Sequence, residues 1–394
     1  MILLLFKYLT SLGWKIPTAF SYSSTRMMLA ALTSLVLTII LGPRFIKRLY
    51  ELKTGQSIRV EDCPMLAQLH EKKKNTPSMG GVLMLFSMCM ALLLWMDLSS
   101  SYTLIFFVTI LWLGFIGGYD DYLKLKHKNS KGLRPRKKFL AQILFAALIA
   151  AYGICPGFAE SLNVGTWFTP PVAKIQTQVV QTTDFMTQYY VPFYKEPLFQ
   201  LSGILAAVGF LFSMIVITGS SNAVNLTDGL DGLASGCVIL TAGVLALVAF
   251  LSNNLEVSRY LNILYIEGAS EIAVFLCATI GACLGFLWYN GYPAQVFMGD
   301  TGSLALGGVL GVAAVLLRRE VLLALVGGIF VAEALSVILQ VTSYRFRNKK
   351  RIFLCTPLHH HFEYKGWPET KVVLRFWIIG LILAVIGVIS LKVQ

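Results

Sequence analysis

The residues best suited to chemistry are five aspartates, each at or near the end of a long apolar segment. They are Asp120 and Asp121 in GGYDDYLK, Asp228 and Asp231 in NLTDGLDG, and Asp300 in FMGDTG. Carboxylates gathered amid basic segments predict a Mg²⁺ site, because Mg²⁺ prefers carboxylate and phosphate oxygens and keeps several waters. Carboxylates alone would repel a phosphate, whereas a metal ion between them reverses the sign of the interaction. We therefore expect a Mg²⁺ site for a phosphate-bearing substrate, with Lys and Arg nearby to pair with it.

Two loops that carry three of these aspartates, 220–232 and 290–302, have no Lys or Arg. Their candidate polar and aromatic residues are Asn225, Asp228, Asp231, Asn290, Phe297 and Asp300. The first three are spaced by three residues, so on a helix they would share one face. This grouping favours a binding site in these loops.

Each candidate also has a plain structural interpretation. Asp300 precedes an apolar segment and could serve only as its N-cap. Asp120 and Lys124 have the i,i+4 spacing of a weak surface ion pair. NLTDGLDGLA could be a capped turn rich in Gly and Asp. The functional interpretation is favoured because five acids, two asparagines and one aromatic residue converge on one membrane face.

The histidines of PLHHHFE are a separate candidate. His359, His360 and His361 are consecutive, so their side chains point in different directions and do not predict a zinc site. A lysine in HEKKKN (70–75) is usually solvated or faces lipid headgroups. Glu333 lies inside an apolar segment, where it is either functional or hydrogen-bonds between helices.

The elements that must position these residues are membrane-spanning helices. Of 394 residues, 56% are hydrophobic and 13% charged, against about 25% charged in a soluble protein. This composition excludes a soluble domain, a disordered chain and a fibrous protein, and predicts a single all-α, polytopic integral-membrane domain over residues 1–394. The segments are too long and too uniform for β-barrel strands. Ten candidate spans cover roughly 25–43, 79–96, 102–119, 138–155, 201–219, 233–252, 271–289, 303–317, 321–341 and 372–391.

Basic residues are distributed unevenly between the loops. The loops 44–78, 120–138 and 342–371 carry 23 Lys and Arg, whereas the alternating loops carry five. Because Lys and Arg accumulate on the cytoplasmic side, both termini are predicted to be periplasmic and the aspartates to face the cytoplasm. The net charge of +13 is therefore explained by topology, and we expect no nucleic-acid partner.

Two further segments lie outside the predicted spans. MILLLFKYL at the N-terminus is short and lacks a cleavage site, which favours an interfacial helix over a removed signal peptide. The external loop 156–200 contains TQVVQTTDF and YYVPFY, which predict a short β-hairpin.

Several long strings resemble the MraY family, the phospho-N-acetylmuramoyl-pentapeptide-transferases of the polyprenyl-phosphate N-acetylhexosamine-1-phosphate transferase superfamily. Ser78 stands where Thr is usual in that family, Cys355 and Thr356 precede PLHHH, and the external loop is long, but no departure affects the acids. In family order, the strings are TPSMGG (76–81), GGYDDYLK (117–124), NAVNLTDGLDGLA (222–234), FLWYNGYPAQVFMGDTGSLALGG (286–308), PLHHHFE (357–363) and ETKVVLRFW (369–377).

The resemblance implies the first membrane step of peptidoglycan synthesis in the bacterial inner (plasma) membrane. Phospho-MurNAc-pentapeptide would move from UDP-MurNAc-pentapeptide to undecaprenyl phosphate, giving lipid I and UMP, with Mg²⁺ as cofactor. The family also suggests a homodimer. A sister enzyme that uses UDP-GlcNAc remains an alternative, although PLHHHFE argues against it. A transporter is a second alternative, but transporter sites usually lie near the midplane rather than at helix ends.

The resemblance also implies roles for the catalytic candidates. Asp300 would hold the Mg²⁺ that bridges the UDP pyrophosphate, and Lys73 would neutralise the pyrophosphate as UMP leaves. Asp120, beside Asp121, would orient the acceptor phosphate or remove its residual proton. A phosphate monoester has a second pKa of about 6, so direct attack is favoured over an alternative in which an Asp forms a covalent intermediate.

The remaining candidates would bind substrate. Phe297 can stack on uracil, and Asp or Asn side chains can bond its edge and the ribose. The nucleotide pocket would comprise Asn225, Asp228, Asp231, Asn290 and Phe297. His359, His360 and His361 would contact the substrate phosphate or the sugar-peptide.

Overall fold

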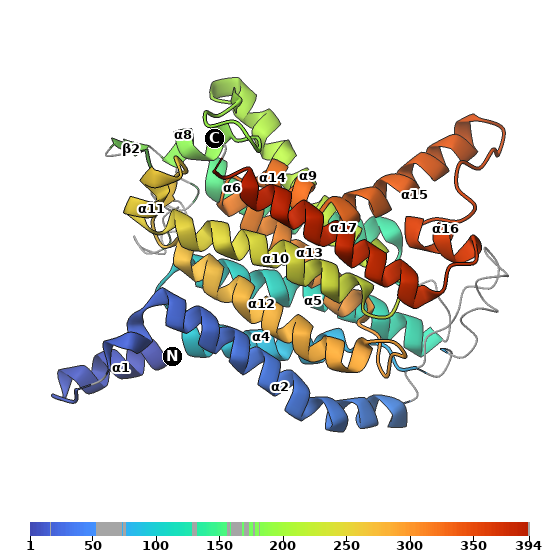
Figure 1. The fold of residues 1–394 in the computed structure, drawn as a ribbon, viewed down its shortest axis with the longest axis horizontal. Helices are drawn as coiled ribbons and strands as arrows, with labels where there is room; N and C mark the ends of the chain where they lie inside the picture. Colours follow the sequence, from blue (N-terminus) through green and yellow to red (C-terminus); the bar gives the residue numbers. More distant parts are fainter. Residues whose placement is uncertain are drawn as a thin grey trace.

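The computed structural model describes residues 1–15, 17–52, 73, 76–127, 132–155, 158, 168, 173–175, 178–180 and 182–392. Within these ranges the chain forms one bundle of long helices that run side by side, with both termini near the same end (Figure 1). Nine helices of this described part are long and apolar enough to cross a membrane. The all-α, multi-pass membrane fold is confirmed.

The long helices overlap the predicted spans, but α2, α5 and α9 continue about two turns past the predicted ends, so that Asp120, Asp121 and Asn225 lie in helices rather than in loops. They are α2 (Ser23–Glu51), α4 (Gly81–Trp95), α5 (Ser101–His127), α6 (Pro135–Ile154), α9 (Ala206–Thr227), α10 (Leu233–Ser252), α12 (Ala269–Asn290), α13 (Gly299–Leu316), α15 (Gly328–Phe346) and α17 (Glu369–Ile389). Shorter helices are α1 (Ile2–Ser11), η1 (Thr18–Ser21), α8 (Thr182–Thr187), η4 (Gly203–Leu205), α11 (Leu255–Tyr260), α14 (Glu320–Val326) and α16 (Leu358–Tyr364). Helix α4 has 15 residues and is shorter than the other spans.

One predicted span, 321–341, is wrong as a single helix. The chain forms α14, ends it at Gly327 and begins α15 at Gly328. A Cβ at Gly328 would lie 2.8 Å from Leu383 Cδ1, so this break lets α17 pack closely against the junction. Hydropathy did not reveal the break because both flanking segments are apolar.

Helix α13 forms the centre of the bundle and carries Asp300 in its first turn. It packs against α5 and α9, and it is buried along nearly its whole length. Glycines make this packing close: a Cβ at Gly117 of α5 would lie 2.2 Å from the Asp300 carbonyl oxygen. Small residues allow membrane helices to approach one another in this way. The contact fixes the start of α13 against α5.

A proline inside α2 has its missing hydrogen bond replaced by a neighbouring helix. Pro43 has no N–H to donate to the Ile39 carbonyl, but the Tyr289 hydroxyl of α12 donates to that oxygen at 2.7 Å. Gly42 leaves the room that the Tyr289 ring needs. The helix therefore continues past the proline to Glu51.

The end of the bundle that holds the termini is covered by short elements. Strand β1 (Ala173–Ile175) pairs antiparallel with β2 (Gln178–Val180) and with β5 (Tyr265–Ile266). Strand β3 (Gln188–Tyr189) pairs with β4 (Phe199–Gln200).

The predicted hairpin between TQVVQTTDF and YYVPFY is wrong, although residues 177 and 181 lie outside the described part. Strand β2 pairs instead with β1, which precedes it, and residues 182–187 are helical. Phe185 and Met186 are almost fully buried in this turn, which packs on α6. Burial of these two side chains overrides the extended preference of the sequence.

Candidate active site

Helix α13 begins at a glycine that permits a close approach. Gly299 has φ +74°, a conformation that L side chains rarely adopt. A Cβ there would lie 2.6 Å from Asp121 Oδ2 and 2.9 Å from Ser78 Oγ. The glycine therefore lets Asp121 of α5 and the loop before α4 reach the first turn of α13.

Asp121 caps α13 from the neighbouring helix. Its Oδ1 accepts a hydrogen bond from Asp300 N at 3.2 Å, and its Oδ2 accepts from Thr301 N at 3.0 Å and Thr301 Oγ1 at 2.8 Å. A carboxylate at this position satisfies free N–H groups and complements the helix dipole. Asp300 is thus not the N-cap that its plain interpretation suggested. Asp121 caps the helix instead, and its buried carboxylate fixes the position of Asp300.

Two lysines join Asp300 to Asp120. Lys124 Nζ lies 2.8 Å from Asp300 Oδ2 and 2.9 Å from Asp120 Oδ2. Lys138 Nζ lies 2.6 Å from Asp300 Oδ2 and 3.3 Å from Asp120 Oδ2. The other Asp120 oxygen accepts a hydrogen bond from the Leu133 backbone. Asp120 is 3% exposed, so its contact with Lys124 is part of a buried network and not a surface pair.

Helix α9 supplies the contacts to the other Asp300 oxygen. Asn225 Nδ2 donates to Asp300 Oδ1 at 2.8 Å and to Ser303 Oγ at 2.8 Å. Asp228 follows the last residue of α9 and accepts a hydrogen bond from Gly299 N. Burial and the nearby carboxylates of Asp300, Asp121 and Asp231 raise the pKa of Asp228 to about 8. A cation bound beside Asp228 would offset this repulsion and favour the charged carboxylate.

The donor set fits Mg²⁺ better than a metal held by protein alone. In the described part of the chain, no three His, Cys, Asp or Glu side chains are grouped to hold one metal ion. Mg²⁺ is usually held by one or two carboxylates, waters and substrate phosphates, so it does not need such a group. Asp300 is partly exposed and its carboxylate is fixed by Asn225 and the two lysines, so it could serve as such a ligand in exchange for a lysine contact.

A second cluster joins the loop before α4 to α17. Lys73 Nζ lies 2.6 Å from Asp231 Oδ1 and 2.6 Å from Glu369 Oε1. Glu369 Oε1 also accepts from Asp231 N at 2.8 Å, and Asp231 Oδ2 accepts from Ala294 N at 3.0 Å. The Lys73 ammonium lies 5.9 Å from the centre of the Phe297 ring. This cluster brings Lys73 close to Asp231 and Phe297, two of the residues predicted to line the nucleotide pocket.

Asn290 and Phe297 have different environments. Asn290 is buried; its Oδ1 accepts from Gly232 N at 3.0 Å and its Nδ2 donates to Val296 O at 2.9 Å. It therefore holds two loops together through both ends of its amide. The backbone of Phe297 forms hydrogen bonds with Pro77 O and Gly80 N. The residue is only partly buried.

The three histidines lie on α16 and have separate partners. His359 has no exposed surface: its backbone N and Nδ1 each lie 3.1 Å from Glu333 Oε1, and a Cβ at Gly229 would lie 2.2 Å from its Nε2. His360 Nδ1 lies 2.7 Å from Glu363 Oε2. His361 Nδ1 accepts from Leu354 N. His359 thus packs against Gly229 in the Asp228–Asp231 loop, while His360 and His361 are partly exposed.

Sequence reasoning missed three members of the site. Lys138 was counted only as a topology charge, Lys124 as a topology charge and a surface partner of Asp120, and Glu369 was not singled out. For Lys124 the signal was its position one turn after Asp120; Glu369 lies in the string ETKVVLRFW. Nothing local distinguished Lys138 from Lys137, because the contact with Asp300 depends on how α6 packs.

The chain is similar to several known proteins over nearly its whole length. Residues 103–318 match the family model for glycosyl transferase family 4, and residues 73–85 match phospho-N-acetylmuramoyl-pentapeptide-transferase signature 1. The chain is 62% identical to the phospho-N-acetylmuramoyl-pentapeptide-transferase of Protochlamydia amoebophila over 96% of both chains. It is 47% and 46% identical to proteins of the same name from Thermodesulfovibrio yellowstonii and Leptospira biflexa, each over 95% of both chains.

Proposed function

This chain belongs to the phospho-N-acetylmuramoyl-pentapeptide-transferase family, and we propose that it transfers phospho-MurNAc-pentapeptide from UDP-MurNAc-pentapeptide to undecaprenyl phosphate in the bacterial inner membrane. The products are lipid I and UMP. The observation that carries the mechanism is the fixed Asp300 carboxylate, which two lysines and Asn225 hold at the end of a membrane-spanning bundle. A lipid acceptor can reach such a site from the bilayer, and a nucleotide donor from the aqueous side.

The acceptor needs positioning more than deprotonation. A phosphate monoester with a second pKa of about 6 is largely dianionic at pH 7, so it is already a competent nucleophile. The main barrier is the repulsion between two polyanions, which cationic side chains and alignment reduce. Lys124 and Lys138 supply this charge, and Asp120 holds both lysines in place to receive the acceptor phosphate.

Asp300 is the proposed Mg²⁺ ligand, and Asp228 is a nearby carboxyl group that could add a second oxygen. When bound, Mg²⁺ would neutralise charge on the UDP pyrophosphate. Asp121 keeps Asp300 in place through the first turn of α13. An Asp300→Asn variant should lose Mg²⁺-dependent turnover while remaining folded. Near-normal activity at the Mg²⁺ concentration used for the parent would contradict the assignment of Asp300 as the Mg²⁺ ligand.

The second cluster is the proposed nucleotide end of the site. The partly open Phe297 ring can stack on uracil, and Asp231 can accept hydrogen bonds from the nucleotide. Lys73 is held between Asp231 and Glu369 and can turn from them toward a pyrophosphate. It would neutralise the UMP phosphate as the bond to the sugar phosphate breaks.

The test is UMP release by the purified full-length chain in detergent, with each of UDP-MurNAc-pentapeptide, undecaprenyl phosphate and Mg²⁺ omitted in turn. We expect release only when all three are present, and no release from UDP-GlcNAc. A phospho-sugar enzyme trapped in the absence of the lipid acceptor would instead support a covalent intermediate.

A further inference from the structure

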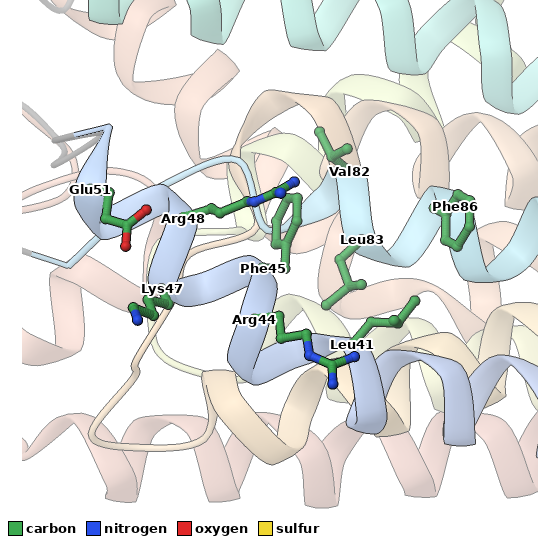
Figure 2. A pocket seen from close by; sticks show the side chains of 9 residues that line it. All are labelled: Leu41, Arg44, Phe45, Lys47, Arg48, Glu51, Val82, Leu83 and Phe86. Atoms are coloured by element: carbon green, nitrogen blue, oxygen red, sulfur yellow. The ribbon is translucent and has the colours of Figure 1, made fainter.

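A groove lies between the last turns of α2 and the first turns of α4 (Figure 2). Its volume is about 640 Å³, within the range of about 300–1000 Å³ that is typical of small-molecule sites. Phe45 of α2 and Val82 and Phe86 of α4 provide apolar walls, and Arg44 and Arg48 of α2 provide positive charge. The groove thus combines a polar end with an apolar surface.

The charged residues of the groove are not neutralised by one another. Arg44 and Arg48 are separated by one helical turn and repel each other. Lys47 adds a third cation, and Glu51 is the single carboxylate that lines the groove. Among the described residues, no ion pair involves Arg44, Lys47 or Arg48. In Figure 2, Glu51 and Lys47 lie at one end of this group of residues, whereas the Arg48 guanidinium points away from both, toward Val82. The excess positive charge favours an anion.

The position of the groove along α2 matches the edge of a bilayer. Residues 23–42 of α2 contain one charged residue, Arg26, whereas Arg44, Lys47 and Arg48 follow within two turns. Val82 is 38% exposed and Phe86 49% exposed beside them. Basic pockets between membrane-spanning helices bind lipid headgroups, and apolar side chains below the headgroup level contact acyl chains.

We propose that this groove binds one anionic phospholipid from the adjacent leaflet. The lipid phosphate lies between Arg44 and Arg48, and an acyl chain follows Val82 and Phe86. Helix α4 begins at Gly81, whose N–H donates to the Met298 carbonyl just ahead of α13. A lipid in the groove therefore rests on the same helix that supports the start of α13. The site is separate from the Asp300 cluster and does not depend on the proposed transferase reaction.

The test is lipid binding to the delipidated full-length chain, measured by native mass spectrometry. The probes are dioleoyl phosphatidylglycerol, dioleoyl phosphatidylcholine, undecaprenyl phosphate and inorganic phosphate. The variant is Arg44→Gln with Arg48→Gln. The matched control is Arg345→Gln with Arg347→Gln, two exposed arginines of α15 and its C-cap that lie outside the groove.

We expect the groove variant to bind phosphatidylglycerol about thirtyfold more weakly, and the control to bind it as the parent does. Equal phosphatidylglycerol binding by parent and variant would overturn the proposal. Loss of undecaprenyl phosphate alone, or of inorganic phosphate alone, would overturn it as well, because the groove would then serve the acceptor or a soluble anion. A change in oligomeric state with lipid binding intact would instead identify an interface between copies. If the double variant does not fold, each single substitution should weaken binding about fivefold, and two unchanged single variants would refute the proposal.

Discussion

Lys138 is expected to contribute to catalysis, and its neighbour Lys137 provides a matched control. Lys138 Nζ lies 2.6 Å from Asp300 Oδ2, and its side chain is only 16% exposed. A charge-assisted hydrogen bond, such as the one we propose from Lys138 to the acceptor phosphate, contributes about 1.5–3 kcal/mol, and partial exposure favours the lower half of that range. A loss of about 2 kcal/mol corresponds to about a thirtyfold decrease in kcat/KM for a Lys138→Met variant.

The assay is UMP release at a series of Mg²⁺ concentrations. Lys138 competes with any cation that approaches Asp300 Oδ2, so its removal should lower the Mg²⁺ concentration needed for half-maximal rate. The variant would then combine a lower maximal rate with tighter apparent Mg²⁺ binding. A purely structural defect does not predict this combination, because it would weaken both.

The control is Lys137→Met, at an exposed side chain that forms no ion pair within the described part of the chain. We expect it to match the parent in rate, Mg²⁺ dependence and melting temperature. The reasoning is refuted if Lys138→Met keeps its activity within twofold, or if both variants lose activity equally. A Lys138→Arg variant should recover part of the rate, since it restores the charge but not the shape of the ammonium group.

Three further predictions concern other parts of the site. Lys73→Ala should raise KM for the UDP-sugar and lower turnover, each by about tenfold or less, because one charge-assisted contact is lost; unchanged steady-state constants would contradict the pyrophosphate role. Gly299→Ala should impose about 1–3 kcal/mol of backbone strain at φ +74° and reduce UMP release sharply, and wild-type activity in this variant would show that the Asp121 approach is not needed. Glu333→Gln should lower the melting temperature by a few degrees, because its buried bond to His359 is weakened, whereas the exposed control Glu256→Gln should melt like the parent.

The membrane fold could be predicted from the sequence because the bilayer constrains the length and composition of each segment that crosses it. Each span must be apolar over about 20 residues, so length and hydropathy alone located almost all the helices. The same argument could not detect the break at Gly327, since α14 and α15 are both apolar and hydropathy carries no information on how α17 packs at their junction.

The candidate site was also foreseen in outline. Residue types and positions at helix ends identified Asp120, Asp300 and their companions, because carboxylates in such places are rare and costly. The sequence did not show which carboxylates already pair with other groups of the protein and which could bind a ligand. Asp121 is adjacent to Asp120 in the chain, yet it caps α13, while Asp120 holds two lysines.

The sequence by itself therefore determined the class of fold, the positions of the candidate acids near helix ends and the resemblance to a transferase family. Tertiary structure alone decided which charges meet. Lys138 reaches Asp300 across 162 positions of the chain, and Lys73 reaches Glu369 across 296. Contacts at such separations depend on how whole helices pack against one another, and no local pattern around Lys138 or Glu369 encodes that packing.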